Sequence, residues 1–208
     1  MRGLLEAIEA FNRKERFFLF SYATGNDDRG LRLSDEFRNK LGAAVGVPVP
    51  PDAKGYIDYH LDWLHAAVAL AREPDGPSIR PNRVPGADKP IVSTGNQEDI
   101  DLLVAFDRGA VSWLLLIEAK AATGWTNKPV RSKADRLQRI FGADKTDPAA
   151  SIQPIFCLMS PRRPAGLAPS AEGKWPDWML VSSTNDFAWL ELPVPPGRKR
   201  SLAAPMAG

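Results

Sequence analysis

The sequence predicts one α/β domain in which helices flank a mixed sheet, and three observations lead to this prediction. Apolar residues recur at helical spacing in residues 4–22, 56–72 and 130–141. Residues 102–106 and 111–117 are instead almost continuously apolar, as strands covered on both faces are. Finally, a chain of 208 residues suits a single domain and is long enough to bury a sizeable core.

The composition is ordinary for a soluble globular protein, with 44% apolar and 25% charged residues. The one cysteine, Cys157, lies in an apolar stretch, so it forms no disulfide within the chain and fits a reducing compartment. Glu6 and Glu9 interrupt the early apolar residues, which argues against a signal peptide. The apolar runs fall short of the ~20 residues that span a membrane. We therefore expect a cytoplasmic protein that does not enter a membrane.

We expect residues 1–73 to form N-terminal helices. The first helix, residues 4–22, has one apolar stripe, formed by Leu4, Ile8, Phe11, Phe18 and Tyr22. Ser34 is the expected N-cap of a second helix that ends near Gly42. A third helix runs from Tyr56 to Arg72 and buries a stripe of Ile57, Leu61, Leu64, Val68 and Ala71.

Four polar residues of this third helix could belong to a site, but their spacing does not favour one. His60 and His65 are five residues apart and do not share a helical face, which indicates ordinary boundary positions. Asp58 and Asp62 do share a face, although no third metal ligand lies nearby in the sequence. A solvated surface is the better interpretation of that pair.

The core of the domain is expected in residues 89–160. Residues 73–90 contain five prolines and are predicted to form a surface loop, after which Ile91-Val92 ends a first short strand. The two apolar runs then form a hairpin. A helix over 130–141, stopped by Gly142, and a strand over 151–160 complete the core.

The remaining residues, 161–208, form a small C-terminal extension. Two further strands are expected at 179–182 and 187–192. Three tryptophans are expected to pack rather than to stack on bases: Trp175, Trp178 and Trp189. The tail from Pro195 contains three consecutive basic residues and is expected to be flexible.

Charged residues stand at the ends of the hairpin strands. Glu118 and Lys120 close the second apolar run, and on a strand they share a face because side chains alternate. Asp101 opens the preceding run. A buried strand that ends in two charges indicates either a surface ion pair or a functional site.

This arrangement, Asp101 followed after a hairpin by Glu118-Ala119-Lys120, resembles the PD-(D/E)XK nuclease superfamily, which includes restriction enzymes and Holliday-junction resolvases. Ile100 replaces the proline that often precedes the Asp in that superfamily. The resemblance implies a restriction-endonuclease-like α-β-β-β-α-β core with helical N-terminal and small C-terminal elaborations. It also implies hydrolysis of phosphodiester bonds, with DNA favoured over RNA.

The resemblance assigns roles to these residues. Asp101 and Glu118 would hold Mg²⁺ or Mn²⁺, and Lys120 would position or activate the attacking water. Three further candidates are Glu15, a carboxylate in the apolar stripe of the first helix, Asp99 as a reserve ligand, and Gln138 near the substrate. A local salt bridge with the neighbouring basic residues is the alternative for Glu15.

Basic residues gather beside this site. Residues 120–145 contain seven Lys or Arg against two acids, although the formal net charge of the chain is only +2. One face of the helix over 130–141 is therefore expected to contact phosphates through Lys128, Arg131, Arg136 and Arg139. An ordinary solvated helix would show the same pattern. The expected partner is nucleic acid, together with a second copy of the chain or another protein.

The chemistry also constrains the hairpin. A loop of two or four residues centred on Arg108-Gly109 makes paired residue numbers sum to 217, so that Asp99 faces Glu118 and Asp101 lies diagonal to it. A loop of odd length sends Asp101 to the other face unless a bulge restores it. We therefore predict an even loop or a bulge, with both carboxylates converging beside Lys120.

Two other functions remain open from the sequence. The chain could be a catalytically silent nucleic-acid-binding or assembly subunit of a host-defence or phage-related complex. It could also be a small α/β interaction protein without a nucleic-acid role. Degradation of a plasmid in the presence of Mg²⁺ separates the nuclease from both.

Overall fold

The computed structural model describes residues 3–11, 19, 22–23, 25, 30–72, 98–121, 125, 127–142, 151–164, 167, 175–181 and 183–193. The helices are α1 (Leu4–Phe11), α3 (Asp35–Val45), α4 (Leu61–Arg72) and α5 (Asn127–Phe141), with a 3₁₀ turn at Asp177–Met179. The strands are β1 (Leu31–Arg32), β2 (Lys54–His60), β3 (Asp99–Arg108), β4 (Val111–Ala119), β5 (Ile152–Ser160), β6 (Leu180–Val181) and β7 (Asp186–Glu191).

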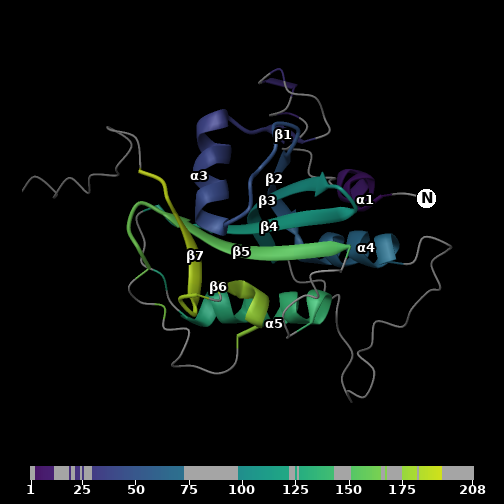
Figure 1. The fold of residues 1–208 in the computed structure, drawn as a ribbon. Helices are drawn as coiled ribbons and strands as arrows, with labels where there is room; N and C mark the ends of the chain where they lie inside the picture. Colours follow the sequence, from purple (N-terminus) through teal and green to yellow (C-terminus); the bar gives the residue numbers. More distant parts are fainter. Residues whose placement is uncertain are drawn as a thin grey trace, which may run out of the picture.

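These strands form one mixed sheet in the order β1-β2-β3-β4-β5-β7-β6. Strands β2, β3 and β4 are antiparallel neighbours, whereas β5 runs parallel to β4 and β7 runs parallel to β5. Helix α3 covers one face of the sheet and α5 covers the other (Figure 1). The predicted α/β class, with a mixed sheet flanked by helices, is confirmed.

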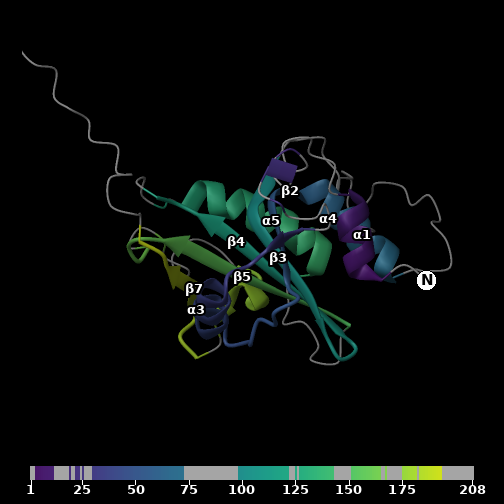
Figure 2. The ribbon, with the colours of Figure 1, turned by 90° about the horizontal axis from the view of Figure 1, so that it is seen from above.

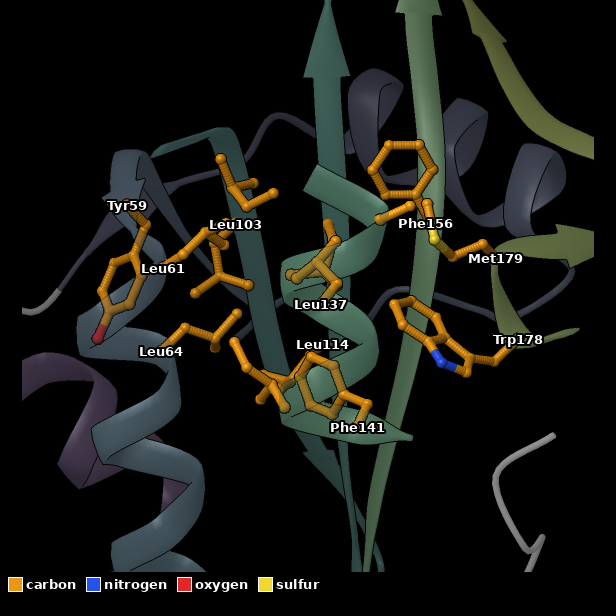
Figure 3. Packing of buried hydrophobic residues seen from close by; sticks show 14 of the residues in the cluster. Tyr59, Leu61, Leu64, Leu103, Leu114, Leu137, Phe141, Phe156, Trp178 and Met179 are labelled. Carbon is orange, nitrogen blue, oxygen red and sulfur yellow. The ribbon is translucent and has the colours of Figure 1, made fainter. Parts of the chain in front are cut away.

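Side chains of the central strands alternate between two apolar clusters. Leu103 of β3 and Phe156 of β5 join the larger cluster, which includes residues of α1, α4 and α5. Leu137 of α5 lies between these two side chains (Figure 3). Val104 of β3 packs instead into the smaller cluster, where Leu41 of α3 is fully buried. From above, α1 and α4 lie side by side at one end of the sheet (Figure 2).

Helix α3 begins as predicted and ends later than predicted. The Ser34 hydroxyl caps it by accepting a hydrogen bond from the Phe37 N–H at 3.2 Å. The helix continues past Gly42 to Gly46, which adopts the left-handed conformation with φ 73°. Gly42 serves packing instead, because a Cβ there would lie 3.0 Å from the Val47 carbonyl oxygen.

The predicted third helix is wrong in its first part. Residues Lys54–His60 form β2, and α4 begins only at Leu61. Tyr56 pairs with Leu103 of β3, and this stretch is rich in aromatic and β-branched residues that suit a strand. Asp58 has φ 50°, and Tyr56 and Tyr59 on either side of it both reach the larger cluster. The helical spacing therefore combined a strand with the helix that follows it.

The predicted first helix is helical wherever the structure describes it, in α1 and at residues 19, 22 and 23, but its apolar stripe is confirmed only at the start. Leu4 and Ile8 are buried in α1, but Tyr22 is 90% exposed and does not continue their stripe. Phe18, the predicted loop at 73–90, the Ile91-Val92 strand and the tail from Pro195 lie outside the described residues.

The elements after the hairpin agree with the prediction. Helix α5 ends at Gly142, whose φ is 93° and whose N–H donates to the Gln138 carbonyl at 2.8 Å. Strands β5 and β7 stand where strands were expected, and Trp175 and Trp178 are buried. No helix in the described part of the chain is both long and apolar enough to cross a membrane.

Candidate functional site

The hairpin turn brings Asp101 and Glu118 together. Strands β3 and β4 pair from Arg108–Val111 to Leu102–Ile117, so the turn consists of Gly109 and Ala110. Gly109 has φ 64°, a conformation that suits glycine in such a turn. One step beyond the last pair, Asp101 stands opposite Glu118. The even loop is confirmed, but the register differs by two residues from the predicted one.

Asp101 is fixed against the neighbouring strand. Its Oδ2 accepts a hydrogen bond from the Ala119 N–H at 2.7 Å. A carboxylate thus takes the place that a backbone carbonyl of β3 would have in a continued ladder. The bond holds the Asp101 side chain over the end of β4, next to Glu118.

Glu118 is buried on the α5 side of the sheet, with a residue exposure of 7%. Its Oε1 accepts a hydrogen bond from the Lys133 ammonium of α5. Burial raises the pKa of Glu118 to about 7; the Lys133 charge opposes this rise, and the Asp101 charge adds to it. The site is therefore a buried Glu118 carboxylate beside the half-buried Asp101, with the Lys133 ammonium in contact with Glu118.

Lys120 continues β4 by one residue. Its N–H donates to the Met159 carbonyl at 2.9 Å, and strand alternation directs its side chain to the Glu118 side. Within the described residues, no ion pair joins its ammonium to a carboxylate. The structure thus brings Asp101 and Glu118 together as predicted, whereas the lysine that contacts Glu118 is Lys133 and not Lys120.

The sequence did not single out Lys133 as a partner of Glu118, because it is one of several basic residues in the segment 120–145. At 100° per residue it lies on the flank of the apolar stripe that Val130 and Leu137 define. A basic residue at that position covers the edge of the core. Because a carboxylate, Glu118, was expected at the end of the facing strand, the position of Lys133 beside the apolar stripe was the signal for an ion pair between them.

Arg136 does not lie on the exposed face of α5, which corrects the prediction that it contacts phosphates. Its residue exposure is 7%, and it forms ion pairs with Asp62 of α4 and with Glu98, the latter at 3.4 Å. On the helical wheel Arg136 lies next to Lys133 and Ile140, beside the packed stripe. Asp62 consequently belongs to a buried ion-pair network rather than to a solvated surface.

The other predicted contacts of α5 remain at its outer surface. Arg131 pairs with Asp135 at 3.3 Å and lies over the Trp175 ring at 5.1 Å. Arg139 is exposed, and Gln138 is half-buried. The Lys128 side chain and Glu15 lie outside the described residues.

The two histidines have separate local roles. His60 pairs with Asp99 across β2 and β3, and its Nδ1 accepts the Asp62 N–H at 3.2 Å at the start of α4. Burial lowers the pKa of His65, which lies further along α4. The structure leaves Asp99 beside the site, two residues before Asp101 on β3.

The carboxylate pair can be compared with the ligand sets that hold divalent cations. Among the described residues, no group of three or more His, Cys, Asp and Glu side chains converges on one point. Mg²⁺, however, is commonly held by one or two carboxylates together with water and substrate phosphates. Asp101 Oδ2 accepts the Ala119 N–H, and the Glu118 carboxylate accepts hydrogen bonds from Lys133 and from the Asp101 backbone N–H.

The arrangement can therefore combine two carboxylates, two lysines and a basic helix surface at one edge of the sheet. Such a set can place a hard cation and an anionic substrate next to each other. Comparison of the chain with family models, curated proteins and solved structures gave no match.

Proposed function

We propose that the protein is a metal-dependent nuclease that hydrolyses phosphodiester bonds, with DNA favoured over RNA. The observation that carries this proposal is the position of Asp101 directly opposite Glu118, at the end of two buried strands and facing α5. Two carboxylates on opposed positions of neighbouring strands have Cβ atoms about 5 Å apart, within reach of one cation.

The order of the elements supports the same proposal. Helix α3, the antiparallel strands β2, β3 and β4, helix α5 and the parallel strand β5 follow one another as α-β-β-β-α-β, apart from the inserted α4. The two helices of this series cover opposite faces of the sheet (Figure 1). This is the arrangement expected for a restriction-endonuclease-like core, with the carboxylates on its second and third strands.

Each residue has a chemical role in this proposal. Asp101 and Glu118 would hold Mg²⁺ or Mn²⁺, which when bound supplies a water of lowered pKa and offsets charge on the phosphate. The Ala119 N–H orients Asp101. Lys120 holds the attacking water or stabilises the negative charge that develops on the phosphate. Arg131 and Arg139 contact the phosphate backbone away from the scissile bond.

Cleavage of a plasmid and of a labelled duplex by the purified protein tests this proposal. We expect cleavage with Mg²⁺ or Mn²⁺ that EDTA abolishes. Asp101→Asn and Lys120→Ala should each lower the rate by roughly 100-fold or more, because each removes a group that acts on the reacting atoms. Circular dichroism would show that both variants remain folded.

The matched control is Lys40→Ala, which removes an exposed lysine on α3, on the other face of the sheet. It should cleave at the wild-type rate. Wild-type protein that cleaves neither DNA nor RNA with either metal would contradict the proposal, as would full activity of Lys120→Ala.

A second candidate is a catalytically silent nucleic-acid-binding subunit. One observation favours it: Lys133 already neutralises Glu118 without a metal. Such a subunit would bind DNA in a salt-sensitive manner and would not cleave it at any Mg²⁺ concentration. The same cleavage assay, read together with a binding assay, separates the two candidates.

A further inference from the structure

We propose that Lys133 is a positioning residue that holds Glu118 as an ion pair until a divalent cation takes its place. The inference rests on the proposed function, because it assumes that Asp101 and Glu118 hold the metal. Lys133 and the metal would then compete for the same carboxylate, and the lysine would set the affinity of the site for the metal.

The ion pair between Lys133 and Glu118 is largely buried and is not a surface contact. The Lys133 ammonium donates to Glu118 Oε1, and the two side chains are only 15% and 10% exposed. Helix α5 is fixed above the sheet by buried residues on both sides of Lys133, namely Val130, Ala134 and Leu137. The lysine is therefore held at the carboxylate by the packing of its helix.

The position of Asp101 directs a shared cation toward the carboxylate that Lys133 contacts. Its Oδ2 is tied to the Ala119 N–H, so a cation shared by both carboxylates must lie between Asp101 and Glu118. Mg²⁺ binds carboxylate oxygens at about 2.0–2.1 Å, and an ammonium binds them at about 2.7–2.9 Å. Two cations on one buried carboxylate would repel each other strongly, because the dry surroundings screen them poorly.

Release of Lys133 requires only a side-chain movement. Arg136, one turn further along α5, is anchored to Asp62 of α4 and to Glu98. These ion pairs hold the helix backbone against α4 and the start of β3. The flexible lysine side chain can then turn from Glu118 toward a bound phosphate while α5 stays in position.

Titration of the protein with Mn²⁺ at pH 8, without nucleic acid, tests the inference by calorimetry. Lys133→Met should bind Mn²⁺ at least about tenfold more tightly than the wild type, because it removes a competing and repelling charge. Lys133→Arg keeps the charge and should bind like the wild type. Lys40→Met removes the lysine of an exposed Lys–Glu pair on α3 and should leave the affinity unchanged.

The outcomes distinguish the two proposals. Measurable Mn²⁺ binding that is equal or weaker in Lys133→Met overturns the role of Lys133 and leaves the metal site intact. Absence of Mn²⁺ binding in both proteins overturns the role of Lys133 at a preformed metal site, while the cleavage assay decides on the nuclease proposal. If Lys133→Met does not fold, Lys133→Gln replaces it; this variant is also neutral but can still donate to Glu118, and the same tighter binding is required.

Discussion

At the residue scale, buried ionisable groups decide what this site can be. Glu118 keeps a raised pKa although a lysine contacts it, because the loss of hydration outweighs one ion pair. Strand alternation alone puts Glu118 and Lys120 on one sheet face, whereas the prediction that Asp101 shares this face depended on a hairpin loop of even length, which the structure has. The helical position of Lys133 made it a candidate partner of Glu118, but which cation makes the contact depends on how α5 rotates about its axis when it packs.

The pKa of His65 provides a second test of how burial affects an ionisable side chain. Burial lowers its pKa, the Asp62 charge opposes this, and the Arg72 charge adds to it, so the folded protein binds fewer protons here than the unfolded chain. The free energy of unfolding should therefore fall as the pH drops below the ordinary histidine pKa of 6.5. The contribution is fully present above that pH.

Urea denaturation at pH 7.5, 6.5 and 5.5 measures this contribution (the three values bracket the ordinary histidine pKa of about 6.5). His65→Gln cannot titrate and should lose less stability over that range than the wild type. Parallel curves for the two proteins would show that His65 titrates alike in the folded and unfolded states.

At the scale of single elements, capping residues located the start of α3 and the end of α5, whereas helical spacing missed the beginning of β2 and Gly42 did not mark the end of α3. Ser34 and Gly142 are capping residues whose effect depends on their own helix, and both act as expected. The segment from Tyr56 to His60 instead becomes a strand because β3 lies beside it. The paired residues are between 39 (His60 and Asp99) and 47 (Tyr56 and Leu103) positions apart in the sequence, and helical spacing cannot reveal such a partner.

The β3–β4 turn makes a prediction about Gly109. Its φ of 64° is unfavourable for residues with a Cβ, although the space around it is open. Gly109→Ala should therefore lower the free energy of unfolding by about 1–2 kcal/mol through backbone strain alone. Gly109→Asn should lose clearly less, because asparagine tolerates this conformation. Equal losses in urea denaturation would argue against this turn geometry.

At the scale of the whole molecule, the two faces of the sheet differ in kind. One face is closed by α3, while the other is covered by α5 with α1 and α4 and carries the charged groups at its edge (Figures 1 and 2). The sequence predicted the order of the core elements from the hairpin onward. The Arg136 network joins α5, α4 and Glu98, which directly precedes β3, so only the assembled fold could reveal it.

The outer surface of α5 should set the salt dependence of DNA binding. Arg131→Gln and Arg139→Gln together should weaken binding to all sequences and reduce the slope of log K against log salt by about 0.9 per lost phosphate contact. Fluorescence anisotropy between low and moderate salt measures the slope, with Lys40→Gln on α3 as the control. A slope that stays the same would mean that this surface meets only solvent.

The length of the turn at Gly109 and Ala110 decides whether Asp101 and Glu118 lie on the same face of the sheet. Insertion or loss of a single residue there, without a bulge, would exchange the two faces of one strand, so that Asp101 would face α3 while Glu118 faced α5. A change of two residues would keep both carboxylates on the same face, but Asp101 would no longer lie directly opposite Glu118. Natural variants of this hairpin that retain the carboxylate pair should therefore differ in turn length by an even number of residues. Otherwise they should carry a bulge that returns both carboxylates to the same face.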